Sequence, residues 1–287
     1  MTIAPVLDRL VRLLDLERIE ENIFRGVSPE TPLMRVFGGQ VAGQALVAAG
    51  RTVPAERKVH SLHAYFIRGG DPAVPIVYEV DRIRDGRSFT TRRVIAIQHG
   101  QAIFALSASF QIVEDGIEHA DAMPPVPEPE SLPTLSERIG PYAGKVRPAG
   151  HLDLPIDIRY VDDPPWISRE RGPRASAVSR VWMRADGVLP EDDLLHVCVL
   201  AYASDMTLLD SVLARHGLAW GLDKVKGASL DHAMWFHRPF RADDWILYDC
   251  SSPSASNSRG LALGRFFARD GSLVATVVQE GLMRVLA

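Results

Sequence analysis

The amino-acid sequence predicts an α+β protein built from two tandem repeats, each with one helix packed on a curved antiparallel sheet. Two observations support this fold class. Similar segments recur in the two halves of the 287-residue chain, and in each half a helical pattern precedes several strand-like runs. We expect the first repeat over residues 1–115, a proline-rich connector over 116–155 and the second repeat over 156–287.

The internal repeat is clearest between Ser61–Gln111 and Ser229–Gln279. Both segments run 50 positions from a serine to a glutamine, and both contain a His-Ala pair near the start. His63-Ala64 in the first segment answers His232-Ala233 in the second. Matches of this length and order indicate a duplication.

Each half contains one segment with helical spacing of apolar residues. In residues 38–50 these residues fall on one helical face, and Gly50 suits the end of the helix. In the second half, Ser204 is a suitable N-cap for a helix that ends before Gly217. We therefore expect helices at 38–50 and at 204–217.

The strand-like runs are joined by short turn sequences. Asp270-Gly271 connects the runs 261–267 and 273–279, and His99-Gly100 connects 92–97 and 103–111. Eleven of the twenty prolines lie between Pro124 and Pro173. Proline lacks a backbone donor and fixes φ, so this region is expected to be an extended connector.

Composition excludes several classes of protein. The net charge of −4 disfavours a nucleic-acid partner, and no stretch approaches the roughly 20 apolar residues of a membrane-spanning helix. Two cysteines, Cys198 and Cys250, cannot build a disulfide framework, and no secretory signal is evident at the start. We expect a cytoplasmic protein without a membrane partner.

Six ordered motifs carry a resemblance to a known family. They are VFGGQVAGQAL at 36–46, VHSLHAYF at 59–66, YASD at 202–205, DHAMWFHR at 231–238, SASNSRG at 254–260 and VQEG at 278–281. With them the sequence resembles the type II acyl-CoA thioesterases of bacteria and peroxisomes, which have a double hot-dog fold. The resemblance implies hydrolysis of medium- to long-chain fatty acyl-CoA, without a cofactor or a metal.

The resemblance also implies the catalytic residues. The family has an Asp at the start of the second-repeat helix, a hydroxyl residue before the Asp-His-x-Met-Trp strand and a Gln near the C-terminus. These positions are Asp205, Ser229 and Gln279 here, with Ser229 in the place of the usual Thr. A carboxylate can accept a proton from an attacking water, and a hydroxyl and an amide can hold that water in place.

Other residues are candidates for contacts with the substrate. Gly38 and Gly39 precede a helix, where backbone N–H groups favour an oxyanion. Arg259 suits coenzyme A phosphates, although a solvated surface role fits it equally well. His63 and His232 are candidates for the same site, or are satisfied core histidines.

The two repeats differ in their acidic residues. The first-repeat segment that we align with Asp205, residues 37–40, has no carboxylate. We therefore expect one working site per chain, with first-repeat residues forming its other wall.

Three alternatives are weighed against thioester hydrolysis. An enoyl-CoA hydratase of this fold usually has Asp-x-x-x-x-His, and none of the nine histidines has an Asp five positions before it. A Ser-His-Asp hydrolase would need a Gly-x-Ser-x-Gly turn, which is lacking. A non-catalytic acyl-CoA-binding module remains open. Because hot-dog sheets have edges and faces that pair, we also expect a homodimer or a higher homo-oligomer.

Overall fold

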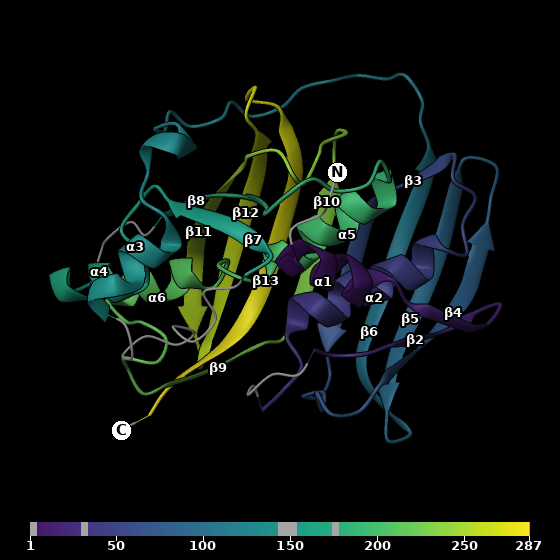
Figure 1. Cartoon of the computed structure of the whole chain (residues 1–287), viewed down its shortest axis with the longest axis horizontal. Helices are drawn as coiled ribbons and strands as arrows, with labels where there is room; N and C mark the ends of the chain where they lie inside the picture. The colour runs from purple at the N-terminus through teal and green to yellow at the C-terminus, as the bar shows by residue number, and fades with distance from the viewer. Residues whose placement is uncertain (1–4, 30–33, 143–153, 174–177, 287) are drawn as a thin grey trace.

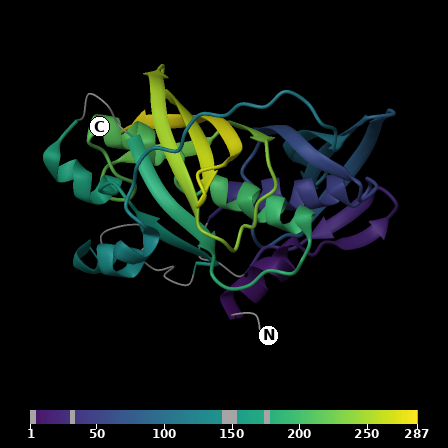
Figure 2. The same ribbon diagram turned by 90° about the horizontal axis from the view of Figure 1, so that it is seen from above.

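The computed structural model describes residues 5–29, 34–142, 154–173 and 178–286. Within these ranges, one 13-stranded antiparallel sheet runs through the molecule, and the helices α1, α2 and α5 lie together on one of its faces (Figures 1 and 2). The strand order is β1-β2-β4-β5-β6-β3-β10-β13-β12-β11-β8-β7, and β9 also pairs with β13. The predicted α+β class with a helix layer on an antiparallel sheet is confirmed.

The first repeat begins with helix α1 and then supplies half of the sheet. Its elements are α1 Pro5–Leu14, β1 Glu17–Glu20, β2 Ile23–Gly26, α2 Gly38–Gly50, β3 Arg57–Phe66, β4 Ile76–Asp85, β5 Phe89–Gln98 and β6 Gln101–Ile112. The predicted hairpin at His99-Gly100 joins β5 to β6, and both turn residues have positive φ, at 49° and 71°.

The second repeat supplies the other half. After the short elements η1 Pro129–Ser131, α3 Leu135–Ile139 and η2 Gly140–Tyr142 come β7 Ile156–Tyr160, α4 Pro165–Ser168, η3 Arg169–Arg171, β8 Val178–Ala185, α5 Asp193–Ser204, α6 Asp210–His216, β9 Val225–Ser229, β10 Asp231–Phe236, β11 Ile246–Ser256, β12 Arg259–Ala268 and β13 Leu273–Val285. The predicted hairpin at Asp270-Gly271 joins β12 to β13. The expected connector, 116–155, contains no strand in its described part, and residues 143–153 lie outside the described residues.

The predicted helix at 204–217 is wrong. The main second-repeat helix, α5, lies earlier, and Ser204 is its last residue rather than an N-cap. Its true N-cap is Asp192, whose carboxylate accepts hydrogen bonds from the N–H groups of Leu194 and Leu195 at 2.9 and 3.3 Å. Only the short helix α6 occupies part of the expected range. Asp205 therefore follows a helix instead of beginning one.

Helices α2 and α5 pack against each other in opposite directions. The contact is close because α2 carries glycines: a Cβ at Gly39 would lie 2.2 Å from the carbonyl oxygen of Tyr202, and one at Gly43 would lie 3.2 Å from that of Cys198. No larger residue fits at position 39 without separating the helices. This packing places the C-terminal end of α5 beside the first turn of α2.

The two repeats are related by a pseudo-twofold axis between β3 and β10. These strands pair antiparallel at the centre of the sheet, and the strand order reads outward as 3-6-5-4-2 on one side and 10-13-12-11-8 on the other. The register of the paired strands then matches residues across the axis. Leu62 of β3 lies opposite Ala108 of β6, as His232 of β10 lies opposite Gln279 of β13. On the other side, Arg92 of β5 lies opposite Ala108, as Ala262 of β12 lies opposite Gln279.

This register corrects the alignment from the sequence. The counterpart of His232 is Leu62, one position away from the expected His63. Gln111, the residue that ends the first-repeat segment, pairs with Lys58 and is not the counterpart of Gln279. In a strand, a slip of one residue moves every side chain to the opposite face. The equal spacing of 50 positions is therefore not a structural equivalence.

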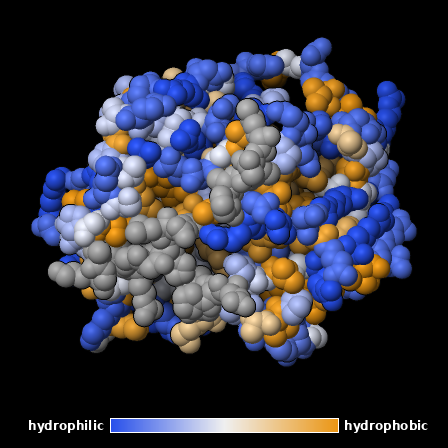
Figure 3. Space-filling model, viewed as in Figure 1, coloured by the Kyte–Doolittle hydropathy of each residue, from blue (hydrophilic) through white to orange (hydrophobic). Residues whose placement is uncertain are grey.

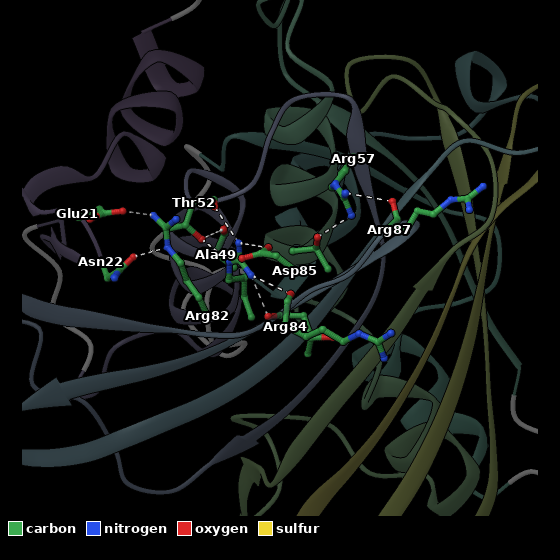
Figure 4. Close-up of polar contacts among 12 residues, drawn as sticks. Glu21, Asn22, Ala49, Thr52, Arg57, Arg82, Arg84, Asp85 and Arg87 are labelled. Atoms are coloured by element: carbon green, nitrogen blue, oxygen red, sulfur yellow. Dashed lines mark hydrogen bonds and ion pairs between the residues drawn. The ribbon is translucent and has the colours of Figure 1, made fainter.

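A buried arginine fills the core of the first repeat at the position where the second repeat has Ala262. The Arg92 side chain is 1% exposed, and its guanidinium donates to Thr52 and to Asp85. The ion pair with Asp85 and the hydrogen bond to Thr52 belong to a polar network that continues to Arg84, whose carbonyl oxygen accepts from Arg92 (Figure 4). A buried charge needs such partners, because an unpaired one is costly.

The connector covers the outer face of the second-repeat sheet. It crosses the top of the molecule in the view of Figure 1, from the first repeat to the second. Met123, Val126 and Leu132 pack on a cluster that includes Trp182, and the Trp182 indole N–H donates to the carbonyl oxygen of Pro127 at 2.9 Å. The proline-rich segment therefore acts as a cover for one half of this face.

The molecular surface agrees with the mixed charge of the sequence. Hydrophilic residues make up most of the face in Figure 3, and smaller apolar areas show between them. In the part of the chain that the structure describes, no helix is long and apolar enough to cross a membrane.

Candidate active site

Asp205 lies where the two repeats meet. It is the C-cap residue of α5, and the antiparallel packing of the helices brings it to the first turn of α2. A Cβ at Gly38 would lie 2.5 Å from Asp205 Oδ2, so only glycine leaves room for this carboxylate. The Gly39 N–H donates a hydrogen bond to Asp205. The acid comes from one repeat and its backbone donor from the other.

Ser229 and Gln279 reach the same carboxylate from two paired strands. Ser229 ends β9 and lies opposite Gly281 of β13, two residues beyond Gln279. The Ser229 hydroxyl donates to Asp205 Oδ1 at 2.9 Å, and Gln279 Nε2 donates to the same oxygen at 2.9 Å. Gln279 Nε2 also donates to Ser229 Oγ at 2.6 Å. The structure thus brings together all three predicted catalytic residues.

Solvent exposure differs among the three side chains. Gln279 is fully buried, whereas Asp205 and Ser229 are each partly exposed. The amide therefore forms the inner wall of the group, while the carboxylate and the hydroxyl face outward. A water molecule on this outer side would have both of them within reach.

His232 lies behind Gln279 and fixes the orientation of its amide. Its Nδ1 is 2.5 Å from Gln279 Oε1, and its Nε2 is 2.8 Å from Ser204 Oγ. Because both Gln279 Nε2 hydrogens point to Asp205 and Ser229, Oε1 must accept, and His232 must donate from Nδ1. The Ser204 hydroxyl has one hydrogen and lies 2.8 Å from both His232 Nε2 and the carbonyl oxygen of Ala201, so it donates to only one of them at a time.

Burial moves the pKa values of both titratable groups. Burial raises the pKa of Asp205 above its usual range, and the charge of a protonated His232 and the hydrogen bonds from Gln279, Ser229 and Gly39 oppose this shift. Burial lowers the pKa of His232, which favours the neutral imidazole. A carboxylate with a raised pKa is a stronger base than an ordinary Asp.

A second buried acid supports the strand that carries Ser229. Asp210, in α6, accepts hydrogen bonds from the Tyr160 hydroxyl at 3.2 Å and from the Trp220 indole N–H at 3.0 Å. The Trp220 ring lies against β9, where a Cβ at Gly227 would meet it at 2.3 Å. Burial raises the pKa of Asp210 to about 7.

Comparisons with known proteins identify the family of this chain. A family model described as acyl-CoA thioesterase matches residues 152–282, and one described as acyl-CoA thioesterase N-terminal domain matches residues 28–111. Acyl-coenzyme A thioesterase 8 of Mus musculus is 44% identical to this chain, over 95% of the chain and 88% of its own length. The chain belongs to the acyl-CoA thioesterase family.

Solved structures confirm the fold of this thioesterase. A crystal structure of an acyl-CoA thioesterase II, TesB2, from Mycobacterium marinum has 47% identity and a TM-score of 0.79, and the match covers 97% of this chain and 98% of that one. A hot-dog protein of unknown function from Alicyclobacillus acidocaldarius, at 20% identity, has a TM-score of 0.80 and covers 99% of this chain and all of its own. The predicted type II family, double hot-dog fold and acyl-CoA thioester hydrolase class are confirmed.

Two predicted substrate contacts of the thioesterase do not reach the three catalytic candidates. His63 is exposed on the sheet face opposite to the helices, where its ring meets Trp235 edge-on at 5.2 Å. The one-residue slip in the alignment explains this position. Arg259 binds Glu280 at 2.9 Å, and Glu280 points away from the face that carries Gln279 because side chains alternate along a strand. Of these candidates, Gly38 and Gly39 lie at the site and His232 lies behind it.

The sequence did not reveal two contacts of the site. These are the contact of Ser204 with His232 and the hydrogen bond from the Gly39 N–H to Asp205. Ser204 precedes Asp205 directly, but its contact with His232 depends on how α5 packs on the sheet. The one signal in the sequence was that Ser204 belongs to the YASD motif that ends at Asp205. Among the described residues, no cluster of three or more His, Cys, Asp or Glu side chains is arranged to hold a metal ion.

Proposed function

We propose that this thioesterase hydrolyses medium- to long-chain fatty acyl-CoA with one site per chain, in which Asp205 activates the water. The observation that carries the proposal is the convergence of the Ser229 hydroxyl and the Gln279 amide on one oxygen of Asp205. A water bound on the exposed side of these groups would lose a proton to Asp205 as its oxygen attacks the thioester carbon. Gln279 orients the carboxylate and the Ser229 hydroxyl through its two N–H groups, and the free lone pair of Ser229 Oγ can accept a hydrogen bond from the water.

The first turn of α2 suits the developing oxyanion. Phe37, the residue at the N-cap, has no side-chain hydrogen bond to this turn, and the Gly39 N–H already donates to Asp205, so the other N–H groups of the turn are the candidates for donors to an external acceptor. N–H groups at a helix start carry partial positive charge, which stabilises a tetrahedral oxyanion. Gly38 and Gly39 let Asp205 and the end of α5 approach this turn closely, which brings the carboxylate next to these donors.

The pseudo-twofold arrangement supports one site per chain. It does so through the residues at equivalent places in the structure, which differ from those that the sequence alignment paired. The residue that follows α2, as Asp205 follows α5, is Arg51. The counterparts of His232 and Gln279 are Leu62 and Ala108. The first repeat therefore offers neither the acid nor its polar partners at the equivalent place.

A cytoplasmic location and a homo-oligomeric state belong to the same proposal. The first-repeat half of the outer sheet face exposes Tyr65, at 67%, next to the half that the connector covers. An exposed aromatic side chain on a sheet face is a suitable contact for a second copy.

Acyl-CoA substrates of graded chain length and a thiol reagent test the function. The wild type should release free coenzyme A from chains of about eight carbons or more, the size that we assign to medium and long chains. Ser229→Ala should lower kcat by about 10-fold to 100-fold, the size typical for removal of a group that positions a reactant. Ser229→Thr, which restores the usual residue of the family, is the matched control and should keep its activity. Full activity in Ser229→Ala would remove this residue from the mechanism, and binding without turnover by the wild type would indicate a non-catalytic acyl-CoA-binding protein.

A further inference from the structure

A cavity of about 830 Å³ lies at the opposite end of α2 and α5 from Asp205. The residues after α2, the start of β3, the end of β6, the start of α5 and the segment after β10 form its walls. Val59, Phe110 and Phe236 give it apolar surface. This volume is in the range of sites that hold small molecules, roughly 300–1,000 Å³.

The pseudo-twofold axis relates this cavity to the active site. The axis exchanges the end of α5 with the end of α2, the start of α2 with the start of α5, and the strands β9 and β10 with β3. The elements around Asp205, Ser229 and Gln279 therefore map onto the elements around the cavity. The cavity is the duplicate of the substrate-binding region, in the position where a second active site would lie.

The chemistry of hydrolysis is lacking in this duplicate. By register, Val59 takes the place of Ser229, and Ala108 takes the place of Gln279. The N–H groups at the start of α5 are occupied by the side chain of Asp192, whereas the start of α2 has no such cap. Arg51 stands at the position equivalent to Asp205, so the duplicate lacks the base at that position, and the donors at the start of α5 are capped.

Guanidinium groups without acidic partners collect beside the cavity. Arg57 lines it, and its side chain donates to Thr90 Oγ1 at 2.9 Å and to the carbonyl oxygen of Arg87 at 3.2 Å. Among the described residues, no carboxylate lies within 4.0 Å of the guanidinium of Arg57, Arg84 or Arg87. Figure 4 shows the Arg87 side chain extending away from the hydrogen-bonded residues.

Each acidic side chain of the cavity wall has an ion-pair or hydrogen-bond partner within the protein. Asp193 pairs with Lys58 at 2.9 Å, and Glu191 pairs with Arg241 at 2.6 Å. The two remaining acids are Asp192, which caps α5, and Glu114, which accepts a hydrogen bond from the Ser88 hydroxyl at 3.1 Å. At the turn between β4 and β5, the guanidinium groups of Arg84 and Arg87 outnumber the single carboxylate of Glu114, so positive charge is in excess there next to Arg57.

We propose that this cavity is a second, non-hydrolytic binding site for the coenzyme A moiety. The apolar walls would hold its flexible arm, and Arg57 and Arg87 would meet its phosphates, since guanidinium groups form paired hydrogen bonds with phosphate oxygens. Free coenzyme A and intact acyl-CoA share this chemistry. The proposal rests on the acyl-CoA thioesterase activity of the chain, and it does not depend on the roles of Asp205, Ser229 and Gln279.

Calorimetric titration of the full chain tests this site. The probes are free coenzyme A and a thioether analogue of palmitoyl-CoA, in which a CH₂ group replaces the thioester carbonyl and prevents hydrolysis. We expect two ligands per wild-type chain for at least one probe. Arg57→Ala combined with Arg87→Ala should weaken the second site by about 10-fold or more, because each change removes a charge-assisted contact. Arg82→Ala is the matched control, because Arg82 already pairs with Glu21, and it should keep both sites.

A second variant tests the role of the cavity without removing a positive charge. Ala55→Trp places a large ring on the cavity wall without changing an arginine, and it should reduce the count to one ligand per chain. One ligand per wild-type chain with both probes, or two ligands in both the double variant and Ala55→Trp, would overturn the proposal. Two sites for free coenzyme A would identify the product as an occupant, and two sites for the thioether alone would identify the substrate. Turnover should be unchanged in the double variant, so a failure of the catalytic proposal would be seen separately, in the Asp205 and Ser229 variants.

Discussion

Replacement of Asp205 by Asn should lower activity and at the same time change how stability depends on pH. Asn has nearly the same shape and can still accept from Ser229 and Gln279, but it cannot take a proton from water. Loss of a general base costs about 10²–10⁴ in rate, which corresponds to about 2.7–5.4 kcal/mol of barrier at 1.36 kcal/mol per factor of ten. We expect kcat to fall by that factor.

The stability effect follows from the direction of the pKa shift. Burial raises the pKa of Asp205 in the folded protein above its unfolded value. Between these two values the native state binds more protons than the unfolded state, so the free energy of unfolding falls as pH rises through this window. The slope is at most about 1.4 kcal/mol per pH unit, and it is smaller here because Asp205 is partly exposed and screened. Asp205→Asn should remove this component.

Urea denaturation between pH 4 and pH 8, together with steady-state kinetics, measures both effects. Asp193→Asn is the matched control, because Asp193 lies at the other end of α5 and its hydrogen bond to Lys58 lowers its pKa. The control should keep wild-type kcat. Wild-type activity in Asp205→Asn would refute the role as base, and an unchanged pH dependence of unfolding would refute the effect of burial.

Three further predictions concern the surroundings of the site. Gly38→Ala would place a methyl group 2.5 Å from Asp205 Oδ2, so the carboxylate must move, and kcat should fall by about 10-fold to 100-fold in the thiol-release assay. His232→Leu introduces the residue that the first repeat has at this position and removes the N–H that orients Gln279. We expect kcat to fall by about 10-fold or more while KM stays within about twofold. Equal changes in kcat and KM would contradict an orienting role. Because the pKa of Asp210 is about 7 in the folded state, native Asp210 retains its proton as pH rises from about 4 to 7, and wild-type stability to urea should decrease over that range more steeply than that of Asp210→Asn.

The sequence predicted the hairpins of this fold but missed its central second-repeat helix. The turns at His99-Gly100 and Asp270-Gly271 are local, and their residue types determine the backbone angles there. Helix α5 is apolar on nearly all sides because α2 covers one side and the sheet another. Such a helix lacks the amphipathic pattern that predicts helices, whereas the segment that follows it has the more periodic pattern.

The identity of the catalytic candidates came from the family resemblance, whereas their geometry required the structure. Ser229 and Gln279 lie 24 and 74 positions from Asp205, and no spacing rule indicates that they meet. The error at His63 shows the limit of alignment within strands. Two histidines that match by sequence differ by one position in register, and one is exposed while the other is buried behind Gln279.

The packing of α2 on α5 has a consequence for the evolution of the chain. Asp205 and Gly39 stand on different repeats, so the proposed site lies at their shared boundary, and neither repeat holds all of it. Two identical subunits would have to keep both ends of such a boundary the same. Fusion into one polypeptide lifts that constraint, and one end has kept its acid and amide while the other has Val59, Ala108 and a buried Arg92.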